Sequence, residues 1–189
     1  MDRSLTLILL ATLFAGCSAS GRKDETAPVY GQVPGFSLTE SGGRTVTLNE
    51  LQGKVWVADF IFTSCAGTCP VMSGQMRKLQ DSLPKEIRLV SFSVDPLRDT
   101  PALLAGYAKN LGADPQRWMF LTGDRAALYN LSIKGFKLAL DDAQGSEAEP
   151  ITHSSRFALI DRKGQIRGYY SGTDEDDLQR LSTDARKLL

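Results

Sequence analysis

The chain has 189 residues, of which 42% are hydrophobic and 23% are charged, as expected for one soluble globular domain with its own core. Its 22 Lys and Arg residues balance its 22 Asp and Glu residues, so the formal net charge is zero and we expect no nucleic-acid partner. Because the chain has only one His and three Cys, soft metal ligands are scarce and their positions are informative.

The first residues have the pattern of an export signal. Arg3 precedes an apolar run over residues 5–14, which is shorter than the roughly 20 residues that a membrane-spanning helix needs. The stretch LFAGC resembles a bacterial lipobox, in which Cys17 becomes the lipid-bearing N-terminus. We therefore predict a signal peptide over residues 1–16 and an extracytoplasmic lipoprotein on the bacterial periplasmic face or cell surface, held to the membrane by lipidation of Cys17. A plain secreted protein is the alternative.

A polar, Pro-containing stretch follows the lipobox and predicts a lipid-anchored flexible tether over residues 17–32. From residue 33 the pattern becomes regular, and we assign residues 33–189 to one folded domain. The sequence GFSLTESGGRTVTLNEL predicts two short strands around a Gly42–Gly43 turn, followed by a helical turn over residues 48–51.

A nearly continuous apolar run over residues 54–62 is typical of a central strand that is buried on both faces, with Asp59 as the exception within it. A loop containing two cysteines comes next. Apolar residues at helical spacing then predict a helix over residues 70–82, with Pro70 in the first turn, where its missing N–H costs little.

Strands and helices alternate along the rest of the chain. The pattern predicts strands over 87–94 and 118–121, helices over 101–111 and 124–131, an acidic loop over 141–149, a β-hairpin over 156–172 and a final helix over 174–188. This order predicts an α/β thioredoxin-like fold, with a central mixed sheet flanked by helices and an N-terminal β-hairpin.

The stretch TSCAGTCP places Cys65 and Cys69 in the loop that leads into the predicted helix at Pro70. A helix N-terminus favours thiolate over thiol, and Cys69 is better placed for this effect than Cys65. The spacing allows a reversible redox disulfide between Cys65 and Cys69, a metal clamp, or an inert structural bridge. An inert bridge across so small a loop would add little stability.

His153 is the single histidine and lies just before the predicted hairpin. In thioredoxin-like folds the loop entering that strand faces the cysteine loop, so His153 can reach Cys65 and Cys69. Two thiolates and one imidazole are too few for a closed structural zinc site and suit Cu(I), which soft sulfur ligands select. We therefore predict a metal site of these three residues; a surface histidine without a metal is the alternative.

Three motifs, DFIFTSCAGTCPVM, VSFSVDPLRDTP and THSSRFALID, resemble the Sco/SenC family of thioredoxin-like copper proteins in their order and spacing. The resemblance covers about residues 33–189 and implies a metallochaperone that binds copper, as Cu(I) with Cu(II) as the second oxidation state, through Cys65, Cys69 and His153. It also implies that the chain delivers copper to the dinuclear copper site of cytochrome c oxidase or reduces the cysteines of that site. Ala66 stands where the family often has Pro.

The partners implied by this resemblance are the copper-accepting subunit of a respiratory oxidase and an upstream copper donor or thiol reductant. Family members also show thiol–disulfide activity. A thiol–disulfide oxidoreductase, or a redox sensor without copper delivery, is therefore the alternative, and the sequence leaves open whether the chain is an enzyme.

Three carboxylates lie near the predicted site in the sequence. Asp95 and Asp99 belong to DPLRDTP, where they serve turn and helix-start chemistry or, alternatively, modulate the metal or a docking partner. Asp59, inside the buried strand, would tune the pKa values of the cysteines or pair with a local group.

Overall fold

The structure, a computed structural model, describes residues 28–141 and 152–189. Its main sheet is built from β1 (Gly31–Gln32), β2 (Ser37–Glu40), β3 (Thr45–Thr47), β4 (Trp56–Ile61), β5 (Arg88–Ser93), β6 (Trp118–Thr122), β9 (Arg156–Ile160) and β10 (Gln165–Ser171). The strand order is β1-β10-β9-β4-β5-β6-β2-β3, with β4, β5 and β6 parallel and the other neighbours antiparallel.

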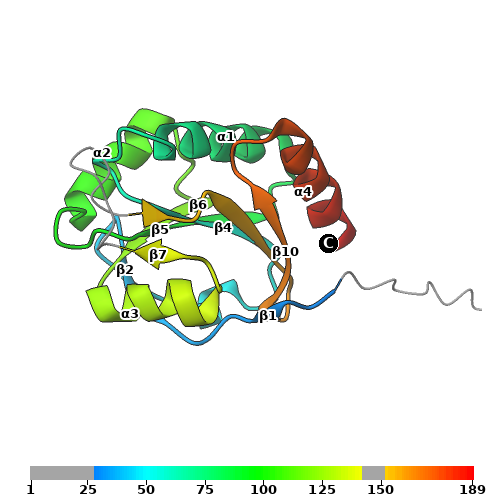
Figure 1. Ribbon diagram of the computed structural model, residues 1–189, viewed down its shortest axis with the longest axis horizontal. Helices are drawn as coiled ribbons and strands as arrows, with labels where there is room; N and C mark the ends of the chain where they lie inside the picture. The colour runs from blue at the N-terminus through cyan, green and yellow to red at the C-terminus, as the bar shows by residue number, and fades with distance from the viewer. Residues whose placement is uncertain (1–27, 142–151) are drawn as a thin grey trace, which may run out of the picture.

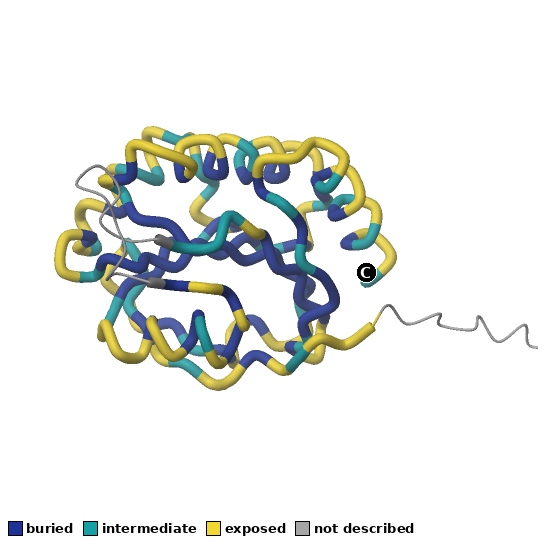
Figure 2. Tube along the Cα trace, viewed as in Figure 1, coloured by how far each residue is buried: buried dark blue, intermediate teal, exposed yellow. Residues whose placement is uncertain are grey.

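Four α-helices cover the sheet: α1 (Cys69–Ser82), α2 (Pro101–Leu111), α3 (Arg125–Asn130) and α4 (Glu175–Lys187). Figure 1 shows α1, α2 and α4 on one side of the sheet and α3 on the other. The predicted thioredoxin-like α/β fold, with its mixed sheet and its N-terminal hairpin of β2 and β3, is confirmed. Figure 2 shows that the strands are largely buried, whereas each helix exposes its outer face.

The central strand β4 explains why the core forms where it does. All six of its residues are buried, and successive side chains point to opposite faces of the sheet. On one face Trp56 and Phe60 pack against Phe136, with ring centroids 6.0 and 5.3 Å apart. Because Asp59 has the opposite parity, it points to the other face, which α1 and α2 cover.

Helices α1 and α2 run side by side in the same direction, because each follows one of two adjacent parallel strands on the same face of the sheet. Ser73 of α1 and Tyr107 of α2 share a hydrogen bond of 2.8 Å. One turn further along each helix, Arg77 donates through Nη1 to the carbonyl oxygens of Leu111 and Gly112, at 3.2 and 2.7 Å. The N-termini of α1 and α2 therefore lie at the same end of the sheet.

Four short elements have no counterpart in the sequence pattern. Strand β1 lies within residues 17–32, the range assigned to the tether, and pairs with β10. Strands β7 (Leu140–Asp141) and β8 (Thr152–His153) pair with each other, and a π-helical turn, η2 (Leu131–Gly135), follows α3. Two-residue strands and a single π turn are too short to produce a recognisable periodicity, which is why sequence pattern does not reveal them.

Other predicted elements agree with the structure to within two residues at their ends, and the helix predicted over residues 124–131 is α3 followed directly by η2. The predicted turn over residues 48–51 is a 3-10 helix, η1 (Leu48–Leu51). The predicted signal peptide, Cys17 and residues 142–149 of the predicted acidic loop lie outside the described residues. The division into signal peptide, tether and domain stays a prediction.

Candidate metal centre

The two cysteines lie where β4 gives way to α1. After β4 ends, the backbone N–H of Cys65 donates to the carbonyl oxygen of Phe62 at 3.3 Å, which turns the loop back over the strand end. Cys69 begins α1, and Pro70 occupies the first turn as predicted. Both cysteines are free thiols, and their side chains are buried, whereas the three residues between them are exposed.

His153 reaches the cysteines from a distant part of the sequence. It ends β8, shortly before β9 pairs antiparallel with β4, and this pairing carries it to the cysteine loop. Its Nε2 atom lies 2.9 Å from Sγ of Cys69, and its ring meets the ring of Phe62 edge-on with centroids 5.6 Å apart. One ligand atom from each of Cys65, Cys69 and His153 can be chosen so that all three lie within 4.8 Å of one another.

Hydrogen bonds assign the proton positions in this group. The Nδ1 atom of His153 lies 3.1 Å from the carbonyl oxygen of Ser154, which can only accept, so Nδ1 carries a hydrogen. In the neutral imidazole the lone pair is then on Nε2 and accepts from the thiol of Cys69. The geometry therefore prepares Nε2 and Sγ of Cys69 to bind one cation in place of the shared proton.

Burial opposes the ionisation of Cys69 in this metal-free arrangement. Burial raises the pKa of the Cys69 thiol above its ordinary value, and the adjacent Cys65 side chain adds to the rise. In the metal-free protein, desolvation therefore opposes the thiolate that the helix N-terminus is expected to favour at Cys69. A metal ion supplies the positive charge that a buried thiolate otherwise lacks.

A carboxylate that accepts several hydrogen bonds fixes the start of the cysteine loop. Asp99 is fully buried, and its oxygens accept from the backbone N–H of Thr63 at 3.2 and 3.3 Å and from the Thr63 hydroxyl at 2.5 Å. It also accepts from the hydroxyl of Ser93 at 2.6 Å. Asp99 thereby ties the residue two positions before Cys65 to the end of β5, a contact across 36 residues of sequence.

The other two predicted carboxylates have different surroundings. Asp95 is buried and its carboxylate accepts from the exposed guanidinium of Arg98 at 2.7 Å, which is turn chemistry next to the loop rather than contact with the cysteines. Asp59 is completely buried, and neither of its oxygens has a hydrogen-bond partner among the described residues. Both alternatives for Asp59, tuning of the cysteine pKa values and pairing with a local group, stay predictions.

Burial changes the ionisation of Asp59. Desolvation raises the pKa of its carboxyl to about 7, and the hydroxyl of Ser91, opposite it on β5, partly offsets this rise. Its charge in turn contributes to the raised pKa values of Cys69 and of Tyr107 on α2. Asp59 is therefore electrostatically coupled to the cysteine site from the sheet side.

Sequence pattern does not predict two contacts that hold the elements of the site in position. Tyr107 has the spacing of an inward-facing residue, but nothing in that spacing predicts its bond to Ser73, four residues after Cys69 on α1. Gly172 donates its N–H to the carbonyl oxygen of Ser155 at 2.8 Å, and an added Cβ would lie 3.1 Å from Cγ of Met72. A side chain at position 172 would therefore crowd Met72 of α1 where the segment that follows His153 approaches this helix.

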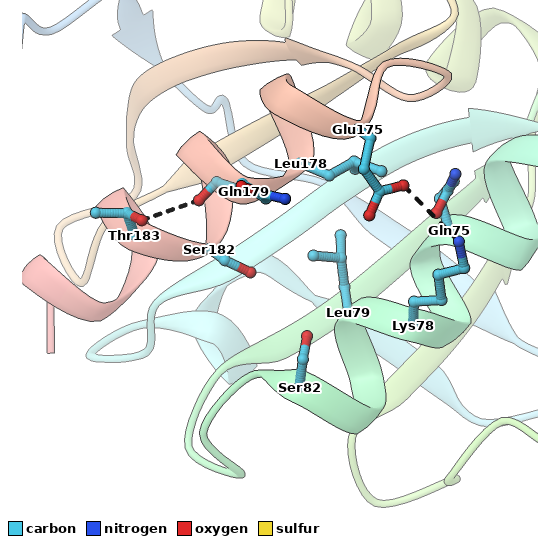
Figure 3. A pocket seen from close by; sticks show the side chains of 9 residues that line it. All are labelled: Gln75, Lys78, Leu79, Ser82, Glu175, Leu178, Gln179, Ser182 and Thr183. Carbon is cyan, nitrogen blue, oxygen red and sulfur yellow. Dashed lines mark hydrogen bonds and ion pairs between the residues drawn. The ribbon is translucent and has the colours of Figure 1, made fainter.

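A separate groove of about 450 Å³ lies between α1 and α4 (Figure 3). Lys78 and Glu175 form an ion pair of 3.8 Å across it, and the buried side chains of Leu79 and Leu178 also line it. Neither cysteine nor His153 lines this groove. Among the described residues, Cys65, Cys69 and His153 are the one group of three or more His, Cys, Asp or Glu side chains placed to hold a metal ion.

The fold and this ligand group define a class of thioredoxin-like proteins with a two-cysteine, one-histidine site. Comparison with known proteins identifies the family, because the SCO1/SenC family model matches residues 24–189. The chain belongs to the SCO1/SenC family. It is 32% identical to the SCO1 protein homolog of Bacillus subtilis over 188 residues, which cover 97% of this chain and 95% of that protein.

Solved structures agree with this assignment. A SCO1/SenC family lipoprotein from Bacillus anthracis superposes with a TM-score of 0.75 and 32% identity, covering 83% of this chain and 94% of that one. BsSco, described with a disulfide switch and as a member of the Sco family of cytochrome c oxidase assembly proteins, gives a TM-score of 0.73 and 32% identity, with 84% and 93% covered. Bradyrhizobium japonicum ScoI, solved with copper bound, has the same fold, with a TM-score of 0.70, 24% identity, and 84% and 99% covered.

No helix within residues 28–141 and 152–189 is long and apolar enough to cross a membrane.

Proposed function

We propose that this chain is a copper metallochaperone that binds Cu(I) through Cys65, Cys69 and His153. The observation that carries the proposal is the convergence of two sulfur atoms and one imidazole nitrogen within 4.8 Å. Thiolate ligands select Cu(I), and the hydrogen bond of Nδ1 to a backbone carbonyl orients the imidazole as metal-binding histidines require. Copper bound to the Bradyrhizobium japonicum relative supports the choice of metal.

The same site is suited to transfer the ion to a partner protein. Only three ligands converge among the residues that the structure describes, His153 is half-buried, and residues 66–68 of the loop are exposed, so a partner's ligands can approach the metal. We propose that the copper-accepting subunit of cytochrome c oxidase takes Cu(I) for its dinuclear centre by ligand exchange, after an upstream donor has loaded the chain. The description of BsSco as an oxidase-assembly protein supports this recipient.

Copper stoichiometry tests the binding site. The unaltered chain should bind one Cu(I) tightly, and each of Cys65→Ser, Cys69→Ser and His153→Ala should abolish tight one-to-one binding. Cys17→Ser is the matched control because it removes a thiol that lies outside the described residues, and it should leave the stoichiometry at one. Full retention of Cu(I) by His153→Ala would rule out the three-ligand site.

Transfer to a partner tests delivery. The copper-loaded chain is mixed with the purified copper-accepting domain of an oxidase, and the appearance of the dinuclear centre is followed by its visible absorption. Formation of the centre supports delivery, whereas retention of all copper by this chain contradicts delivery and leaves the binding site intact.

One observation favours a second function: both cysteines are free thiols, Cys65 in the loop before α1 and Cys69 at the start of this helix. Oxidation of these two thiols to the Cys65–Cys69 disulfide releases two electrons and two protons, which reduce one disulfide of a partner to two thiols. A thiol–disulfide oxidoreductase of this kind would keep its turnover with a disulfide substrate in His153→Ala and without copper. Absence of turnover in the unaltered chain without copper argues for the copper role alone.

We further propose that the chain is an extracytoplasmic lipoprotein anchored through Cys17. The lipobox-like stretch before Cys17 carries this proposal, and the Bacillus anthracis relative, a lipoprotein, supports it. Labelling of cells with a fatty-acid analogue should mark the unaltered chain and fail to mark Cys17→Ser. Equal labelling of both would place any lipid elsewhere.

A further inference from the structure

Two basic pockets lie at the end of the sheet opposite the cysteines. One, of about 240 Å³, is lined by four basic residues and a single carboxylate: Arg44, Lys54, Arg88, Arg117 and Glu50. The other, of about 350 Å³, is also lined by four basic residues and a single carboxylate: Arg162, Lys163, Arg167, Lys187 and Asp161. Although the chain has no net charge, basic side chains are therefore concentrated in two neighbouring pockets.

Strand register places both pockets at the amino ends of the parallel strands. Arg88 pairs with Trp56 at the start of β5 and β4, and Ile160, the last residue of β9 before the β9–β10 turn, pairs with the same Trp56. The backbone N–H of Gly53 donates to the carbonyl oxygen of Arg162 at 2.9 Å, which joins the edge of the first pocket to the second. The metal ligands follow the carboxyl end of β4, roughly 20 Å away along a six-residue strand.

The carboxylates in these pockets are already neutralised. Glu50 is paired with Arg44, and Asp161 is paired with Arg167 at 2.9 Å. Lys187, from the second pocket, is paired with Asp184 at 2.8 Å.

The remaining cations of the two pockets have no such partner. Arg117 is buried and donates to backbone carbonyls, including that of Gln80 at 2.7 Å. Lys54 and Lys163 have no carboxylate within ion-pair distance among the described residues. Arg88 donates to the carbonyl oxygen of Gln116, and Arg162 donates to the backbone oxygen of Leu189. Glu40 also pairs with Arg44, at 2.6 Å, so the positive charge that no carboxylate offsets lies on the other cations of the pockets.

The first described residues of the chain lie beside the second pocket, and their position indicates which partner faces the positive charge. Val29, 52% exposed, lines the second pocket, and Tyr30 beside it is 47% exposed. Cys17 lies eleven positions before Pro28, a length of chain that spans at most about 40 Å when fully extended. A lipid on Cys17 therefore keeps the pocket end within reach of the bilayer, where tyrosine and basic side chains suit the headgroup region.

We propose that the two basic pockets bind the phosphate-bearing headgroups of anionic phospholipids and so hold the domain on a membrane surface with its metal site facing away from the lipid. The binding itself is independent of the copper function, and only the orientation rests on the proposed anchor at Cys17. Attraction between these cations and an anionic surface falls off within a Debye length, so contact needs the pockets themselves at the surface. The occupant is the membrane rather than a free anion because lysines without a carboxylate partner, Lys54 in one pocket and Lys163 in the other, match a surface of many phosphates.

Vesicle binding of the full chain tests the proposal. The chain is sedimented with phosphatidylcholine vesicles that contain or lack phosphatidylglycerol, because the apolar residues 5–14 bind both kinds equally and only the difference reports charge. Lys54→Gln with Lys163→Gln should lower the phosphatidylglycerol-dependent affinity by roughly 30-fold, given the usual contribution of each basic residue at an anionic surface. Raising the salt concentration should remove the same difference in the unaltered chain.

Lys134→Gln with Arg156→Gln is the matched control, because it removes the same net charge from exposed positions outside both pockets. An equal loss in this control, or a pocket variant that binds anionic vesicles as the unaltered chain does, overturns the proposal. Saturable binding of glycerol phosphate at Lys54 and Lys163 without any gain on anionic vesicles also overturns it. The pocket variant should still bind one Cu(I), so failure here is distinguishable from failure of the copper site.

Discussion

At the scale of single residues, Asp99 determines where the cysteine loop begins. Its carboxylate accepts hydrogen bonds from both the N–H and the hydroxyl of Thr63 and from the hydroxyl of Ser93. In Asp99→Asn the neutral amide makes weaker bonds and turns a donor toward one of these groups. We expect Cu(I) affinity, measured by competition with a chelator, to fall by about 10- to 100-fold, as for other groups that orient metal ligands.

Asp95→Asn is the control for this prediction. The carboxylate of Asp95 pairs with Arg98, whose side chain is 62% exposed, and exposed pairs of this kind contribute little. We expect a change in affinity of less than about fivefold. If Asp99→Asn also changed the affinity by less than about fivefold, Asp99 would serve only the start of α2.

The proton between Cys69 and His153 predicts how copper binding depends on pH. Burial raises the pKa of Cys69, so this thiol is protonated at neutral pH and must release its proton when the metal replaces it. Proton release makes metal affinity rise with pH, by about tenfold per pH unit for each proton displaced. Affinities measured by competition at two pH values between about 6.5 and 8 check this slope, and a flat profile would mean that the thiolate exists before the metal arrives.

At the scale of elements, the buried carboxyl within β4 predicts how stability depends on pH. The folded-state pKa of Asp59 is about 7, whereas an unfolded Asp titrates near pH 4, so the folded chain binds more protons between these values. The stability contributed by the neutral carboxyl is fully present below about pH 4 and is lost as pH rises through about 7. The loss is on the order of 4 kcal/mol.

Asp59→Asn tests this dependence because the amide has a similar shape and does not ionise. Urea unfolding at about pH 5 and pH 8 should show a fall in the free energy of unfolding for the unaltered chain that is much smaller in the variant. Asp81→Asn, at an exposed position on α1, is the control and should keep the fall. Parallel profiles for all three proteins would mean that Asp59 is ionised in the folded state at both pH values.

Elements also show which parts of the fold sequence pattern predicts. The apolar run of β4 and the Thr100–Pro101 start of α2 predict both elements because burial and capping leave a local signature. The pairing of β7 with β8 leaves none, since each has two residues, yet this pairing includes His153. Fold order predicts that His153 faces the cysteines, but the contact of Asp99 with Thr63 depends on how β5 and β4 end side by side, which no local pattern encodes.

At the scale of the whole molecule, the ligands come from two distant parts of the chain, because 84 positions separate Cys69 from His153. A bound Cu(I) therefore ties the segment before β9 to the start of α1, whereas a Cys65–Cys69 disulfide closes a loop of only three intervening residues. Closing so short a loop removes little freedom from the unfolded chain, so the disulfide adds little stability. Cu(I) held by all three ligands binds the folded state and stabilises it by mass action, about 4 kcal/mol when copper exceeds its dissociation constant a thousandfold.

We therefore expect the copper-loaded chain to unfold at a higher temperature than the disulfide form, and the disulfide form to differ little from the reduced chain. Thermal unfolding of the three states, followed by circular dichroism, measures the order. In His153→Ala copper can join only the two cysteines of one loop, so most of its stabilisation should disappear while the effect of the disulfide is unchanged. Equal stabilisation by copper and by the disulfide would mean that His153 does not hold the metal in the folded chain, whatever its distance from Cys69 in the metal-free state.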